Sequence, residues 1–156
     1  MQKKSGPKPF TENRKATHEY ETLEKFEGGL ALTGAEVKSI REGGAKLQGA
    51  YVLIQKNELW LIGADIRPYS KAATREAYDP IRHRKILVHK KELAYLAEKT
   101  AEKGLTLIPF SLYSTRHQVK LGFGLCRGRK AHDKREKLKR QDLDRRIRRA
   151  SSYDDV

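Results

Sequence analysis

The chain has 156 residues, and its 34 Lys and Arg residues outnumber its 20 Asp and Glu residues, which gives a formal net charge of +14. Hydrophobic residues make up 37% and charged residues 35%, so the length fits one domain with a small core and a heavily charged surface. The sequence has no apolar run long enough to span a membrane and no secretory signal. Cys126 is its single cysteine, so an internal disulfide is impossible. We therefore expect a soluble cytoplasmic protein without a membrane partner.

The N-terminal part predicts an arm, a strand and a helix. Residues 1–12 hold a glycine and two prolines among polar and charged neighbours, which predicts a flexible arm. Residues 18–26 mix Tyr, Thr, Leu and Phe with Glu, which is typical of a strand with one buried face. Thr33 and Glu36 have the spacing of a capping box, so we expect a helix that runs through Glu42 and ends at two glycines.

The middle of the chain predicts a hairpin followed by a long loop. Two apolar, β-rich runs at 51–55 and 59–64 are separated by residues 56–58, which is a hairpin pattern. Residues 67–84 lack periodicity and contain two prolines and five basic residues, so they predict the longest loop. A short strand is expected at 84–88.

The next segment predicts one more helix and two paired strands. The helix is expected at 90–103, with Gly104 at its end and an apolar face made of Leu93, Leu96, Ala97 and Ala101. Strands are expected at 106–113 and 118–125. About six short strands and two helices without βαβ alternation predict a mainly β fold, an OB-fold-like antiparallel barrel with short helices.

A basic tail follows a boundary near Gly128. Residues 127–149 carry 12 basic and 4 acidic residues, an excess of positive charge equal to that of residues 1–126. This stretch has too few large apolar residues to offset the entropy cost of ordering it alone, although acidic and basic residues four apart favour a helix once a polyanion neutralises the charge. We therefore expect a flexible arm at 1–12, an OB-like RNA-binding body at 13–128, and a basic tail at 129–156 that is disordered when free and helical on its partner. A tail that only aids solubility is the alternative.

Motifs for catalysis and for metal binding are missing from the sequence. The glycine pairs lack the phosphate-loop and dinucleotide patterns, and the five histidines lack metal-ligand spacing. We therefore expect no enzymatic activity, no catalytic residue, no metal site and no cofactor. The excess of Lys and Arg favours phosphate binding, and aromatic residues beside them are able to stack on unpaired bases: Tyr20, Phe26, Tyr69, Tyr78 and Tyr113.

Several motifs in a fixed order carry a resemblance to one family. They lie at Asn13–Tyr20, Phe26–Gly29, Gly34–Arg41, Asp79–Lys85 and Gly124–Arg135. Together they closely resemble the bacterial SsrA-binding proteins (small protein B) over about residues 13–149. The resemblance implies an OB-fold body that binds the tRNA-like domain of transfer-messenger RNA near its elbow.

The resemblance also implies a ribosomal role in trans-translation. The basic tail would enter the decoding centre and the empty mRNA channel of the small ribosomal subunit on a stalled ribosome, and would become helical there. Elongation factor Tu and alanyl-tRNA synthetase would be indirect partners, through the RNA. An OB-fold ribosomal protein or an initiation-factor-like binder of ribosomal RNA is the alternative, and an RNA-processing enzyme would need a catalytic constellation that the sequence lacks.

The resemblance assigns candidate residues to both parts of the chain. The RNA-facing residues of the body would include Glu27, Leu87 and His89, with nearby candidates Asn13, Arg14, His18, Lys38, Arg41, Arg84, Lys85 and Lys120. The ribosome-binding positions of the tail would be Gly128, Lys130, His132, Asp133, Lys134 and Arg135. A carboxylate close to phosphates helps binding only by accepting a hydrogen bond from a base or a 2′-hydroxyl, so this is the role expected of Glu27.

Overall fold

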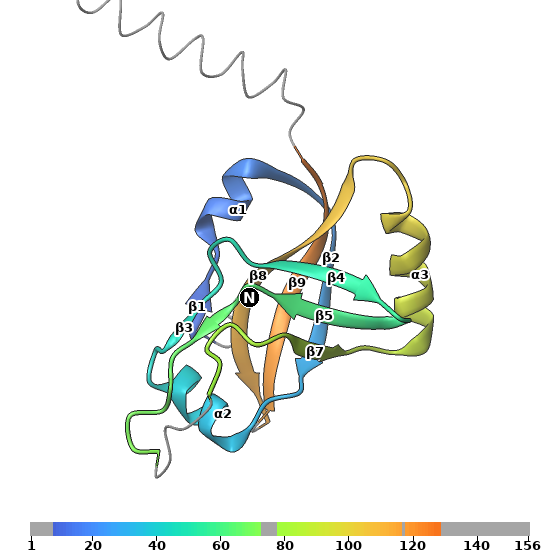
Figure 1. The fold of residues 1–156 in the computed structure, drawn as a ribbon. Helices are drawn as coiled ribbons and strands as arrows, with labels where there is room; N and C mark the ends of the chain where they lie inside the picture. The colour runs from blue at the N-terminus through green and yellow to red at the C-terminus, as the bar shows by residue number, and fades with distance from the viewer. Residues whose placement is uncertain (1–7, 73–77, 117, 129–156) are drawn as a thin grey trace, which may run out of the picture.

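The computed structural model describes residues 8–72, 78–116 and 118–128, and Figure 1 shows its ribbon. Its elements in chain order are β1 (Thr11–Glu12), α1 (Arg14–Glu19), β2 (Tyr20–Leu30), α2 (Gly34–Arg41), β3 (Ala45–Lys46), β4 (Tyr51–Gln55), β5 (Glu58–Ile62), β6 (Asp65–Ile66), β7 (Arg84–Leu87), α3 (Lys90–Thr100), β8 (Leu105–Thr115) and β9 (Gln118–Gly128). The part of the chain that the structure describes is mainly β with short helices, as predicted.

Six strands close into an antiparallel barrel. Their order is β8, β4, β5, β7, β2 and β9, and β9 pairs back with β8. The strands β4, β5, β7, β8 and β9 have the Greek-key arrangement of a five-stranded OB-fold, with α3 between the third and the fourth of them. β2 inserts between β7 and β9 as an additional strand. The predicted OB-like barrel is confirmed, and its wall contains one strand more than the five-stranded form.

Alternate side chains of the strands fill the barrel. On β9 the inward side chains are at most 3% exposed: Val119, Leu121, Phe123 and Leu125. The Phe26 ring of β2 stacks on the Phe123 ring, with 5.7 Å between the ring centroids. This period of two leaves Lys120, Gly122 and Gly124 on the outer face of β9, where the candidate site lies.

Helix α3 packs on the barrel through part of the predicted face, Leu93 and Leu96, together with Tyr95, which was not predicted there. Leu96 is fully buried, and Leu93 and Tyr95 pack against the core cluster. Ala97 and Ala101, which were expected on this face, are exposed. The difference follows from size, because burial of the Tyr95 ring removes more apolar area from water than burial of a methyl group does.

The N-terminal segment differs most from the prediction. Thr11 and Glu12, expected in a flexible arm, form β1 and pair with Leu112 and Ser111 of β8. The strand expected from residue 18 begins at Tyr20, because residues 14–19 form α1. The mixed pattern of that segment fits either element, and Ala16, its buried residue, is what fastens the helix to the barrel.

Smaller differences concern turns and short pairings. The β4–β5 turn consists of Lys56 and Asn57 alone, and both have positive φ, 50° and 60°, as a type I′ hairpin turn requires. The two-residue strands β3 and β6 pair with each other and were not predicted. Helix α3 ends at Thr100 rather than at residue 103, and β8 and β9 are longer than expected.

A buried carboxylate fastens α2 to the loop that follows β6. The predicted capping box is present, because Glu36 accepts a hydrogen bond from the Thr33 amide (3.0 Å) and the Thr33 hydroxyl accepts one from the Glu36 amide (3.2 Å). Glu36 also accepts hydrogen bonds from Arg82 and, at 2.8 Å, from Nε of Arg84. Arg84 in turn donates to the carbonyls of Ala64 (2.7 Å) and Pro80 (3.0 Å).

This network corrects one candidate residue. Arg84 was expected near the RNA, but its side chain is fully buried and its guanidinium bonds the Glu36 carboxylate, the Tyr78 hydroxyl and the carbonyls of Ala64 and Pro80. The charge is paired with Glu36, as a buried guanidinium requires. Arg84 is therefore a structural residue that holds the loop against α2, and it does not face a ligand.

Candidate nucleic-acid interface

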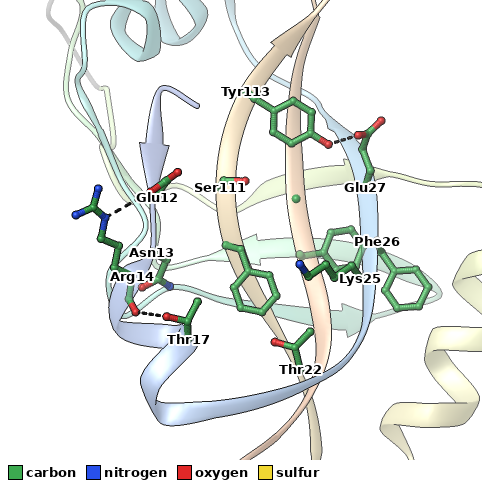
Figure 2. Close-up of a pocket in the computed structure, with 13 residues that line it drawn as sticks. Glu12, Asn13, Arg14, Thr17, Thr22, Lys25, Phe26, Glu27, Ser111 and Tyr113 are labelled. Carbon is green, nitrogen blue, oxygen red and sulfur yellow. Dashed lines mark hydrogen bonds and ion pairs between the residues drawn. The ribbon is translucent and has the colours of Figure 1, made fainter. Parts of the chain in front are cut away.

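Two grooves meet at Glu27 on the outer face of β2 and β9. The α1 groove, shown in Figure 2, is lined by Glu12, Asn13, Arg14, Thr17, Thr22, Lys25, Phe26, Glu27, Phe110, Ser111, Tyr113, Gly122 and Phe123. The α3 groove is lined by Lys25, Phe26, Glu27, Gly28, Gly29, Leu87, Val88, His89, Glu92 and Lys120. Both contain residues 25–27, so Glu27 stands where the two grooves join.

Glycines shape the floor of both grooves. Gly122 lies in the α1 groove, where a side chain would crowd the hydroxyl of Ser111, 3.1 Å from an added Cβ, and the ring of Tyr113 at 3.4 Å. In the α3 groove, Gly28 lets β2 approach β7 closely. Because these glycines place no side chain beside Glu27, a ligand is able to reach the carboxylate.

The Glu27 carboxylate is held on both oxygens. The phenol of Tyr113 donates a hydrogen bond to Oε2, and Nζ of Lys120 donates one to Oε1 over 2.9 Å. The bond from Tyr113, the larger effect, and the bond from Lys120 hold the pKa of the Glu27 carboxyl below its ordinary value. Burial and the neighbouring carboxylate raise the pKa of the Tyr113 phenol. At neutral pH Glu27 is therefore a carboxylate and Tyr113 a neutral phenol that donates to it.

The α3 groove brings together four of the predicted residues from three separate segments. They are Glu27 on β2, Leu87 and His89 at the end of β7 and the start of α3, and Lys120 on β9. His89 and Glu27 are exposed, and 48% of the surface of Leu87 is exposed as well. The groove thus offers an acceptor, a cation, an imidazole and an apolar contact side by side.

The α1 groove contains two more predicted residues, with different roles. Arg14 is exposed, and its guanidinium makes a 3.4 Å contact with Glu12, its one polar side-chain contact among the described residues. Asn13 is only 6% exposed, and its amide donates to the carbonyls of Pro109 (3.0 Å) and Leu47 (3.4 Å). The expectation for Asn13 is corrected accordingly, because its side chain joins β8 to the segment after β3 and has no donor left over for a ligand.

The remaining body candidates lie outside both grooves. His18 is exposed on α1, and Lys38 and Arg41 are exposed on α2, which Figure 1 shows on the opposite side of the barrel from α3. Nζ of Lys38 lies 5.5 Å from the centre of the Tyr69 ring. Lys85 points outward from β7 and bonds Glu58 over 3.2 Å. The structure therefore does not gather all of the predicted residues on one surface.

The sequence analysis did not predict the role of Tyr113 in this surface. Tyr113 entered the prediction only as an aromatic residue suited to stacking, whereas the structure places its hydroxyl on Glu27. The pairing of β8 with β9 brings Tyr113 opposite Lys120, and the pairing of β2 with β9 brings Glu27 opposite Gly122. A period of two was visible in the sequence, but the register between the strands was not.

Replacement of Gly28 by alanine is expected to destabilise the fold and to disturb the α3 groove. An added Cβ would lie 2.6 Å from Cγ2 of Ile86 and 3.1 Å from the carbonyl oxygen of Leu87, so β2 and β7 must move apart. We expect a loss of about 1–3 kcal/mol in the free energy of unfolding, measured with urea. Gly34→Ala is the matched control, because nothing lies within 4 Å of its added Cβ at the start of α2. Equal stability of the two variants would contradict the close approach of the strands.

Five of the six predicted tail positions lie outside the described residues: Lys130, His132, Asp133, Lys134 and Arg135. Gly128, the sixth, is the last residue of β9 and pairs with Tyr20. Within residues 8–72, 78–116 and 118–128, no group of three side chains is arranged to hold a metal ion. No helix in the same ranges is long and apolar enough to cross a membrane.

Comparison with known proteins identifies the family. The family model described as SmpB protein matches residues 10–153. The chain is 47% identical over 143 residues to the SsrA-binding protein of Trichormus variabilis, covering 92% of each chain, and 45% identical over 152 residues to that of Trichodesmium erythraeum, covering 96% of this chain and 97% of the relative. A chain in the solved structure described as "tmRNA-SmpB: a journey to the center of the bacterial ribosome" superposes with a TM-score of 0.64 at 45% identity, covering 78% of this chain and 85% of that one. This chain belongs to the SmpB family of SsrA-binding proteins.

Proposed function

We propose that this protein binds transfer-messenger RNA and delivers it to stalled ribosomes for trans-translation. The observation that carries the proposal is the α3 groove, in which four residues expected to face RNA from their family positions lie together: Glu27, Leu87, His89 and Lys120. The name SsrA-binding protein among the relatives, and the tmRNA and ribosome of the solved neighbour, support the same function. The match extends to residue 153, so it includes the basic segment as well as the barrel.

The body is the part that selects the RNA. Lys120, paired with Glu27, keeps an ammonium beside the ligand, the exposed Leu87 provides an apolar contact, and the exposed imidazole of His89 provides a flat surface for a ribose or a base. Glu27 adds an acceptor, which discriminates between RNA groups where a lysine alone would not. A folded RNA such as the tRNA-like domain fits this mixture better than a uniform duplex does, because recognition of unpaired nucleotides needs donors, acceptors and apolar contacts together.

The tail is the part that engages the ribosome. Residues 127–149 carry a net charge of +8, which suits an RNA-lined channel. Its positions His132, Asp133, Lys134 and Arg135 would contact the decoding centre, and the tail would report that the mRNA channel is empty. In this account the protein is a non-enzymatic adaptor that works in the bacterial cytoplasm, and elongation factor Tu and alanyl-tRNA synthetase act on the RNA that it carries.

Binding of the tRNA-like domain by groove variants tests this proposal. Leu87→Ala and Lys120→Ala are each expected to weaken binding by about tenfold, corresponding to about 1.4 kcal/mol. Lys46→Ala removes an exposed lysine from β3, outside both grooves, and is the charge-matched control that should bind like the wild type. Equal losses for Lys46→Ala and Lys120→Ala would show that only net charge matters, and this would contradict a specific site in the α3 groove.

A further inference from the structure

Tyr113 and Lys120 both donate hydrogen bonds to the Glu27 carboxylate on the same face of the sheet. Both residues lie on the β8–β9 hairpin, where their Cα atoms are direct cross-strand partners, and each bonds a different oxygen of Glu27 on β2. A carboxylate accepts about four hydrogen bonds, so two acceptor positions remain for a ligand. Figure 2 shows the phenol of Tyr113 pointing at Glu27 across the strand between them.

The hydrogen bonds from Tyr113 and Lys120 restrict the Glu27 side chain, which would otherwise be as mobile as an exposed glutamate normally is. The Glu27 side chain is 47% exposed, and a free glutamate at such a position samples several rotamers. Two hydrogen bonds fix it, and Gly122 keeps the space across which the Tyr113 ring reaches the carboxylate. A preorganised acceptor loses less entropy on binding than a mobile one, so its hydrogen bond contributes more to affinity.

The charge balance also fits a ligand that carries phosphates. The ion pair with Lys120 offsets the negative charge of Glu27, and the phenol adds no charge. The carboxylate therefore adds less negative charge to the α3 groove, whose other charged side chains are Lys25 and Glu92, than an unpaired carboxylate would. Without the Lys120 ammonium, the negative charge of Glu27 would repel the phosphates of the RNA, a problem that an uncharged acceptor would not have.

We propose that Tyr113 is a positioning residue that, with Lys120, fixes the Glu27 carboxylate as the acceptor for one hydrogen-bond donor of the bound RNA. The donor is a ribose 2′-hydroxyl or an exocyclic amine of a base, which are two of the donor groups that RNA presents. This inference rests on the proposed function. It assigns Tyr113 an action through Glu27, not a contact of its own with the RNA.

The test is a double-mutant cycle measured with chemically altered RNA. Affinities of the wild type, Tyr113→Phe, Glu27→Ala and the double variant are measured for the tRNA-like domain. The RNA is used unmodified, with single 2′-deoxy substitutions, and with single bases that lack their exocyclic amine. We expect one RNA substitution to weaken wild-type binding by about tenfold, as for the loss of one hydrogen bond to a charged group. Tyr113→Phe should weaken binding to unmodified RNA and lose most of its sensitivity to that substitution.

Tyr95→Phe is the matched control. Tyr95 also donates a hydrogen bond to an exposed carboxylate, that of Glu24 over 2.5 Å, but neither residue lines a groove. This variant should keep the wild-type affinity and the wild-type sensitivity. In the Glu27→Ala background, Tyr113→Phe should have no further effect on affinity.

Two results would overturn the inference and leave the proposed function standing. One is a Tyr113→Phe variant that retains the full sensitivity of the wild type to every RNA substitution. The other is an equal loss of RNA affinity from Tyr113→Phe in the wild-type and the Glu27→Ala backgrounds, which would mean that the tyrosine contacts the RNA directly. Failure of the wild type to prefer the tRNA-like domain over ordinary tRNA is a separate result that overturns both.

Discussion

Removal of residues 129–156 is expected to abolish ribosome rescue while leaving selective RNA binding in place. Both grooves lie within residues 12–123, so the truncated protein keeps every residue that lines them. The removed segment is the whole basic tail, whose Lys and Arg residues bind phosphates without selecting a sequence or a shape. Affinity at low salt should therefore fall for all RNAs alike, whereas the preference for the tRNA-like domain should change by no more than about threefold. Tagging of nascent chains on stalled ribosomes measures the rescue.

A second variant separates charge from specific contact in the tail. The variant replaces Asp133, Lys134 and Arg135 together by alanine, which alters the net charge by only one unit. This triple variant should lose rescue as completely as the truncation does, with RNA binding unchanged. Normal tagging by the triple variant would contradict the role assigned to these residues, and a collapse of RNA selectivity in the truncation would contradict the division between body and tail.

Glu36→Gln is expected to destabilise the protein by about 3–5 kcal/mol, the largest loss of stability expected from a single substitution here. The change leaves the fully buried guanidinium of Arg84 without its counter-charge. It also weakens the capping box and the bond from Arg82, so α2 and the loop after β6 lose a common anchor. Urea unfolding measures the loss. Glu42→Gln, at the exposed end of α2, is the control and should change stability by less than about 0.5 kcal/mol.

The same residue predicts how stability depends on pH. Burial is the largest single influence and raises the pKa of Glu36, but the bonds from the Thr33 amide, Arg82 and Arg84 and the charge of Arg84 together hold it below its ordinary value. The ionised Glu36 carboxylate therefore stabilises the fold fully above the pKa that Glu36 has in the unfolded chain, about 4.3. This stabilisation is lost as the pH falls through the lower pKa that Glu36 has in the folded protein. Acid unfolding of Glu36→Gln should be less steep than that of the wild type. Identical acid transitions would contradict this coupling.

Local signals predicted the elements that local chemistry determines. The capping box at Thr33 and Glu36 and the β4–β5 hairpin depend on residues close in sequence, and both are present. The fold class followed from the number of short strands. What the sequence did not reveal are contacts between distant residues, such as Glu36 with Arg84 and Asn13 with Pro109. A buried arginine and an arginine that binds phosphate look alike in one sequence, because pairing with a distant carboxylate decides between them.

The candidate site shows the same division. Family resemblance supplied Glu27, Leu87, His89 and Lys120, and the barrel brings them into one groove. Strand register, which is set by the packing of the whole barrel, placed Tyr113 beside Glu27. The position of helix α2 on the barrel left Lys38 and Arg41 on another surface. The resemblance therefore supplied candidate residues, and the structure shows which of them share one groove and which, such as Arg84, are buried in the protein.

Competition binding at two salt concentrations tests the central claim most directly. The purified chain is offered transfer-messenger RNA, ordinary tRNA and an unrelated RNA duplex. The account predicts a preference for transfer-messenger RNA that persists at the higher salt, because hydrogen bonds and apolar contacts in the grooves depend little on released counterions. Equal binding to all three RNAs that disappears at the higher salt would contradict it, and would leave only a basic protein that associates with RNA through its charge.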